Sequence, residues 1–148
     1  MPVGSLRAAK RLCELSGWTV SNLEINKMLY IAHMFHLGRG QGALVSDSFE
    51  AWDYGPVLPR VYHRAKAFGG GPVRNVFHDI PEMPAGPDAD MLEEVYTNLR
   101  DARPGHLVNI THWDEGAWAK NYRPGGRHIV IPDSDILDEF RRRAARAA

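Results

Sequence analysis

The feature of the sequence that most constrains its fold is a helix-initiation signal at Ser21. Ser21 and Glu24 form an S-x-x-E capping box, in which each side chain can accept a hydrogen bond from the other residue's backbone N–H. Apolar residues then recur at steps of three or four from Ile25 to Phe35, and Gly38 supplies a stop. The pattern predicts a helix of about four to five turns over residues 21–37. We expect this helix at the centre of the fold.

The remaining elements are predicted from the spacing of apolar and β-prone residues. Helical spacing is found at residues 5–16, 58–68, 88–101 and from about 133 onward, and residues 107–112 can add one or two turns. Residues 49–54 and 128–131 have the pattern of short strands. We expect them to form one antiparallel pair covered by helices, because a lone pair is only marginally stable. The predicted fold class is therefore mainly α with a small antiparallel β-pair (α+β), a compact helical bundle around the central helix.

Length and composition indicate one domain. The 148 residues, 44% hydrophobic and 24% charged, suit a single globular domain spanning residues 1–148. Residues 69–87 contain three successive glycines, four prolines and little periodicity. We therefore expect a Gly/Pro-rich surface loop there and not a linker between two domains.

Charge and cysteine content narrow the class of partner. Lys plus Arg and Asp plus Glu both number 18, so zero net charge argues against nucleic acid as a partner. The arginines near the C-terminus are interpreted as the solvated end of a helix, where cations complement its dipole. Cys13 is the only cysteine, and we assign it to the core. Neither a secretory signal nor about 18 uninterrupted apolar residues are present, so we expect a cytoplasmic protein without a membrane partner.

Few residues suggest catalysis or metal binding. His33 and His36 could face one metal ion, but a zinc site needs a third ligand and none is near in sequence, so we predict no metal and no cofactor. His112 lies close to Asp114 and Glu115, which could provide acid–base groups. No nucleophile motif and no phosphate-binding or dinucleotide-binding glycine motif accompanies them. We therefore predict a binding protein and not an enzyme.

Two blocks of sequence resemble the Panacea domain. The first combines L-x-I-x-K-M-L-Y-x-A at residues 23–32 with F-E-A-W-D-Y-G-P-V-x-P-x-V-Y at residues 49–62. The second is L-x-x-I-T-H-x-x-x-x-x-W at residues 107–118. The resemblance implies an antitoxin of a protein–protein (type II-like) toxin–antitoxin pair, in a family also described as phage-associated. Such an antitoxin would neutralise a cognate toxin, encoded by a neighbouring gene, by direct stoichiometric binding.

The signature blocks and the aromatic content direct attention to one candidate binding surface. Three-residue spacing places Lys27 and Tyr30 on one flank of the central helix, away from the positions predicted to face inward. We expect a partner to contact this flank and the loop beside it; the alternative is that these residues only brace the fold, with Lys27 paired to Asp53. The candidate contacts are Lys27, Tyr30, Asp53, Tyr54, Pro59, Tyr62, His112 and Trp118.

Two other functions stay open from the sequence. The protein could be an adaptor that delivers a bound partner to a cytoplasmic protease. It could also be a small hydrolase or transferase that uses His112 with Asp114 or Glu115. Loss of turnover in a His112→Ala variant would distinguish this enzyme from a binding protein.

Overall fold

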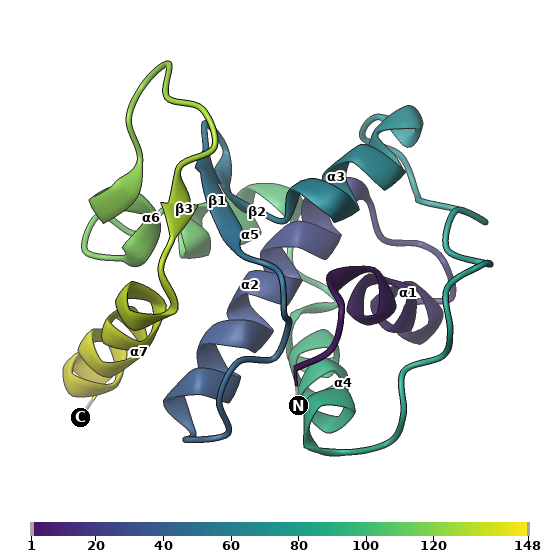
Figure 1. The fold of residues 1–148 in the computed structure, drawn as a ribbon, viewed down its shortest axis with the longest axis horizontal. Helices are drawn as coiled ribbons and strands as arrows, with labels where there is room; N and C mark the ends of the chain where they lie inside the picture. The colour runs from purple at the N-terminus through teal and green to yellow at the C-terminus, as the bar shows by residue number, and fades with distance from the viewer. Residues whose placement is uncertain (1, 148) are drawn as a thin grey trace.

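A computed structural model describes residues 2–147, in which helices surround a central helix and a small sheet (Figure 1). The helices are α1 (Ser5–Leu15), α2 (Asn22–Gly38), α3 (Pro59–Ala65), α4 (Pro87–Leu99), α5 (Pro104–Thr111), α6 (Ala117–Asn121) and α7 (Asp133–Ala147). The strands are β1 (Phe49–Trp52), β2 (Gly55–Val57) and β3 (Val130–Ile131), and a 3-10 turn (Lys66–Phe68) follows α3. The predicted fold class is confirmed.

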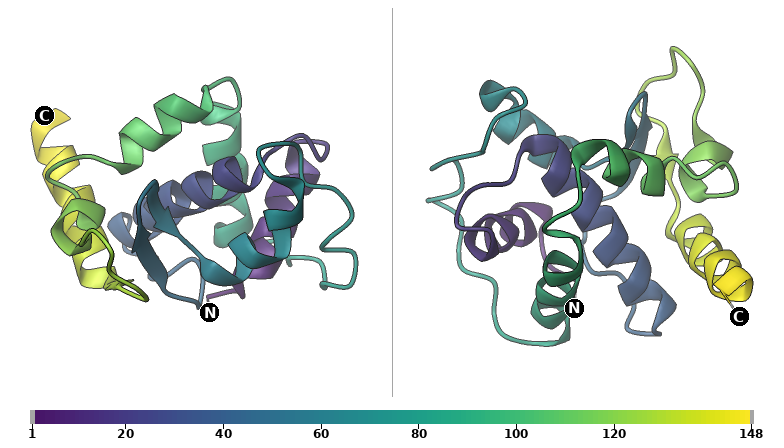
Figure 2. Two further views of the ribbon diagram at one scale, coloured as in Figure 1. Left: turned by 90° about the horizontal axis from the view of Figure 1, so that it is seen from above. Right: turned by 180° about the vertical axis from the view of Figure 1, so that it is seen from behind.

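Helix α2 begins where the capping box predicts. The Glu24 backbone N–H donates to Ser21 Oγ at 3.2 Å, and the Ser21 N–H donates to Glu24 Oε1 at 2.9 Å. The helix then packs against α1, α3, α4, α5, α7 and β2, so it is enclosed on all sides (Figure 2). A helix with no solvent-exposed face buries its polar residues as well. The expectation that Lys27 and Tyr30 lie on an exposed flank is therefore wrong, because both side chains are buried.

The sheet has three strands in the order β2-β1-β3. The expected antiparallel pairing is confirmed, with Glu50 of β1 opposite Val130 of β3. Strand β2 was not predicted, because Gly55 and Pro56 are residues that usually end a strand. Pro56 is tolerated in β2 because β2 lies at the sheet edge, where its missing N–H is not required for pairing.

Residues 69–86, between the 3-10 turn and α4, form the expected irregular segment, but it is attached to the core. Val73 and Phe77 are completely buried within it. Lys10 Nζ donates to the Ile80 carbonyl at 2.7 Å, and Arg64 Nε donates to the Val76 carbonyl at 3.0 Å. The segment therefore covers part of the core between α1 and α3, which its glycine and proline content did not indicate.

Helix α7 is joined to α2 through buried polar contacts. Glu139, only 1% exposed, accepts hydrogen bonds from Tyr30 Oη at 2.7 Å and from the Ala117 N–H at 2.9 Å. The Val45 N–H donates to Nδ1 of His33, so the other ring nitrogen, Nε2, carries the hydrogen and donates to Asp133 at 2.8 Å. These contacts fix α7 and α6 against α2.

Cys13 lies in the core, as predicted, and burial raises the pKa of its thiol to about 12. Among residues 2–147, no helix has the length and apolar character needed to cross a membrane.

Candidate functional site

The two signature blocks of the sequence meet at Gly55. A Cβ atom added there would lie 3.1 Å from Lys27 Cε, 3.2 Å from Thr111 Oγ1 and 3.3 Å from His112 Cδ2. The backbone of Gly55 also has φ of +118°, which side chains other than hydrogen rarely permit. Glycine is therefore required here for two reasons, and its absent side chain lets α2 and the end of α5 approach the β1–β2 turn.

Lys27 lies at the centre of this junction. Its side chain is 1% exposed, and Nζ donates to the Pro56 carbonyl at 2.8 Å. Burial lowers the pKa of this amine from 10.5 to about 7. No carboxylate of residues 2–147 lies within 4.0 Å of Nζ. The suggested pairing of Lys27 with Asp53 is therefore wrong, since Asp53 accepts a hydrogen bond from Tyr122 Oη instead, at 2.5 Å.

His112 begins a column of stacked rings next to Lys27. Its imidazole lies parallel to the Trp118 ring with centroids 3.7 Å apart, and Trp118 stacks on Tyr122 at 4.6 Å. Trp118 Nε1 also donates to the Trp52 carbonyl at 2.7 Å, which ties the column to β1. Tyr122 was not among the contact residues predicted from the sequence, although it follows Trp118 by the four residues that bring side chains together on a helix.

The His112 imidazole is not placed for acid–base chemistry with the carboxylates named from the sequence. Its buried Nε2 has no hydrogen-bond partner among residues 2–147, and Glu115 is paired with Arg146. Burial, and then the nearby Lys27, lower the pKa of His112 below its ordinary value of 6.5. Asp114 lies at the surface. The structure thus does not assemble the His112–carboxylate pair.

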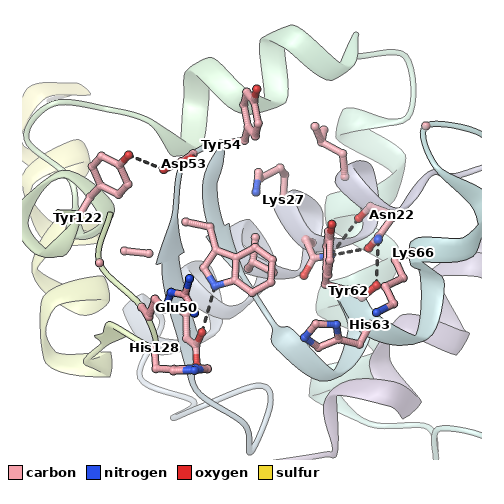
Figure 3. Close-up of a pocket in the computed structure, with 18 of the residues that line it drawn as sticks. Asn22, Lys27, Glu50, Asp53, Tyr54, Tyr62, His63, Lys66, Tyr122 and His128 are labelled. Carbon is pink, nitrogen blue, oxygen red and sulfur yellow. Dashed lines mark hydrogen bonds and ion pairs between the residues drawn. The ribbon is translucent and has the colours of Figure 1, made fainter. Parts of the chain in front are cut away.

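A groove of about 770 Å³ opens beside this junction, between the sheet, α2 and α3 (Figure 3). Four of the predicted contact residues line it: Lys27, Asp53, Tyr54 and Tyr62. Trp52 forms its aromatic wall with Tyr62, whose ring lies edge-on at 4.8 Å, and Tyr54 stands at the rim with 72% of its surface exposed. We call this the Trp52 groove.

The other four predicted contact residues lie outside the Trp52 groove. Tyr30 is enclosed in the core and bound to Glu139, and Pro59 lines a separate shallow depression with Arg60. His112 and Trp118 stand behind the groove, in the stacked column described above. The structure thus brings together only part of the set that the sequence suggested.

The histidines of α2 are engaged in the fold. His36 Nδ1 contacts the Gly42 carbonyl at 2.7 Å, while His33 bonds to Asp133 and Val45. Across the described residues, no group of three or more His, Cys, Asp or Glu side chains is placed to hold a metal ion.

Comparison with known proteins identifies the family. The family described as "Antitoxin SocA-like, Panacea domain" matches residues 25–119, which is almost two thirds of the chain. This chain belongs to the SocA-like Panacea family. The matched range contains all eight contact residues predicted from the sequence, together with Trp52, Gly55 and the start of α6.

One curated member of the SocA-like family can be compared along most of its length. Antitoxin SocA of Caulobacter vibrioides (strain NA1000 / CB15N) is 33% identical over 137 residues, which cover 82% of this chain and 72% of that protein. No solved structure matches the chain. The expected resemblance to the Panacea domain is confirmed by both comparisons.

Proposed function

We propose that this protein is the antitoxin of a type II-like toxin–antitoxin pair and neutralises its toxin by direct, stoichiometric binding. The observation that carries the proposal is the SocA-like Panacea match, which includes the junction at Gly55 and most of the residues that line the Trp52 groove. We expect the toxin to be the product of a neighbouring gene.

The surface around the Trp52 groove has the properties that such binding requires. A tight complex needs a face of about 800 Å² per partner, with a few aromatic or arginine anchors. Trp52, Tyr54 and Tyr62 supply aromatic surface from a rigid strand, turn and helix, so little side-chain freedom is lost on binding. Inhibition of a toxin by covering its active surface needs no cofactor.

We assign the predicted contact residues to three roles. Asp53, Tyr54 and Tyr62 are proposed as direct contacts because they line the open groove. Lys27 is proposed as the floor of the groove. Tyr30, Pro59, His112 and Trp118, also predicted as partner contacts, are proposed to act on binding through the framework that holds the groove in shape.

The proposal is tested by co-expressing the neighbouring gene with and without this protein in a bacterial host. Wild-type protein should restore growth and co-purify with the toxin in equimolar amounts. A harmless neighbour, or rescue without a complex, contradicts the proposal. Rescue accompanied by loss of the toxin polypeptide would instead favour delivery to a protease.

A matched pair of variants distinguishes residues that contact the toxin from residues that only support the fold. Tyr54→Ala should abolish rescue while the melting temperature stays near that of the wild type, because this ring is 72% exposed. Val130→Ala is the control, since Val130 is 48% exposed on β3 and does not line the groove. If both variants rescue growth equally, the contact surface lies elsewhere.

A further inference from the structure

The Trp52 groove contains cations that the fold leaves without carboxylate partners. Lys27 lies at its floor, and Lys66 and Arg127 line its sides. Within residues 2–147, none of the three comes within 4.0 Å of a carboxylate. An ammonium group has three N–H donors, and Lys27 uses one of them on the Pro56 carbonyl. The groove therefore has unused capacity to donate hydrogen bonds and to hold negative charge.

The two carboxylates of the groove accept hydrogen bonds from neutral donors and form no ion pair with these three cations within 4.0 Å among residues 2–147. Glu50 Oε1 accepts a hydrogen bond from Trp52 Nε1 at 3.0 Å, and Asp53 Oδ1 accepts one from Tyr122 at 2.5 Å (Figure 3). His63 also lines the groove, and His128 Nδ1 lies 3.8 Å from Glu50 Oε2. The three cations of the groove thus outnumber its two carboxylates, and they lie beside an aromatic wall.

We propose that the Trp52 groove receives an acidic segment of the toxin, with one carboxylate directed at Lys27 Nζ and others at Lys66 and Arg127. This inference rests on the proposed antitoxin function and specifies the chemistry of the partner. A polypeptide fits better than a nucleic acid, because a peptide can place single carboxylates at the cations and away from Glu50 and Asp53, whereas a phosphate backbone is charged at every nucleotide. The aromatic wall would pack against the apolar parts of such a segment.

The position of Lys27 gives the proposed complex a proton-linked signature. In the free protein its pKa is about 7, so near pH 8 most of the amine is neutral. A carboxylate next to Nζ favours the charged form and raises this pKa in the complex. Binding near pH 8 should then take up a proton, and affinity should fall by up to about tenfold per pH unit above pH 7.

The test is calorimetric titration of the purified toxin into the intact protein near pH 8, in two buffers with different ionisation enthalpies. Wild-type protein should show proton uptake, and Lys27→Met should remove the uptake and weaken binding by about 30-fold or more. Lys66→Ala and Arg127→Ala should each weaken binding by roughly two- to fivefold, as expected for charges at an interface rim. Arg141→Ala, an exposed arginine on α7 outside the groove, is the matched control and should bind like wild type.

The outcomes distinguish this inference from the proposed function. If wild-type protein binds and neutralises the toxin with no proton uptake, and the Lys66 and Arg127 variants match Arg141→Ala, the inference is overturned while the antitoxin function stands. If wild-type protein does not bind the toxin at all, both are overturned. A labelled single-stranded DNA that binds this groove in place of the toxin would also overturn the inference.

Discussion

Replacing Lys27 by methionine should change how the free energy of unfolding depends on pH. The burial of Lys27 determines the direction of that change. In the folded protein burial lowers the pKa of Lys27 to about 7, whereas in the unfolded chain it returns to 10.5. At about 1.36 kcal/mol per pKa unit, holding the charged amine in the fold costs roughly 5 kcal/mol below pH 7. Methionine has a similar shape and carries no charge, so this cost is absent in the variant.

The sign follows from the number of bound protons. Between about pH 7 and pH 10.5 the unfolded chain binds more protons at Lys27 than the folded protein, so wild-type stability rises with pH across this window. Lys27→Met loses the hydrogen bond to Pro56 and leaves a buried carbonyl unpaired, at a cost of roughly 1–3 kcal/mol. The variant should therefore be more stable than wild type by about 2–4 kcal/mol near pH 6, and equal or less stable near pH 10.

The assay is guanidinium unfolding followed by tryptophan fluorescence, for both proteins, at several pH values from about 6 to 10. Other groups titrate in this range, and their contributions cancel in the difference between the two proteins, except that of His112, whose pKa Lys27 lowers. The result that refutes the reasoning is a constant difference in the free energy of unfolding across this pH range. It would mean that water or structural relaxation solvates the charged Lys27 amine, so that its pKa in the folded protein stays near 10.5.

Three further substitutions test the framework around the groove. Ser21→Ala should lower the free energy of unfolding by about 1 kcal/mol, because the capping box loses its side-chain acceptor; an unchanged denaturation midpoint would show that the cap contributes nothing. Phe77→Ala should lower the free energy of unfolding by about 3–5 kcal/mol and expose residues 69–86 to proteolysis. Resistance of this variant to proteolysis would contradict the anchoring of that segment by Phe77. Glu139→Ala should lower the free energy of unfolding by about 3–5 kcal/mol, because Tyr30, Arg143 and a backbone N–H lose their acceptor. Glu139→Gln should lower it less, because the amide keeps one acceptor oxygen. Equal losses in thermal or chemical unfolding would argue against this hydrogen-bond network.

The elements that were predicted from the sequence are those set by local chemistry. The start of α2 depends on Ser21 and Glu24, which are three residues apart, and the helix ends at Gly38, two residues before Gly40 with φ of +78°. The pairing of β1 with β3 followed from two β-prone segments that had no other partner. The exposed position of Tyr54 followed from its place in a tight turn.

The parts that were missed depend on contacts between distant residues. Lysine is rarely buried and tyrosine is intermediate, so complete burial of Lys27 and Tyr30 was not indicated by residue type. Lys27 is held by Pro56, 29 residues away, and Tyr30 by Glu139, 109 residues away. The site could be predicted as a set of residues, but their division between groove and framework required the fold.

The Tyr30–Glu139 contact also bears on when the protein can become active during its synthesis. The residues that enclose the far side of α2 come from α7, so α2 cannot complete its burial until more than a hundred further residues have been made. At roughly 5–20 residues per second, that interval lasts about 5–20 seconds in a bacterial cell. During this time the polar groups of Tyr30 and His33 lack their final partners, and the nascent chain presents an incomplete surface. Under the proposed function, binding of a toxin should therefore begin only after translation of α7, so the fold itself sets a delay of that length.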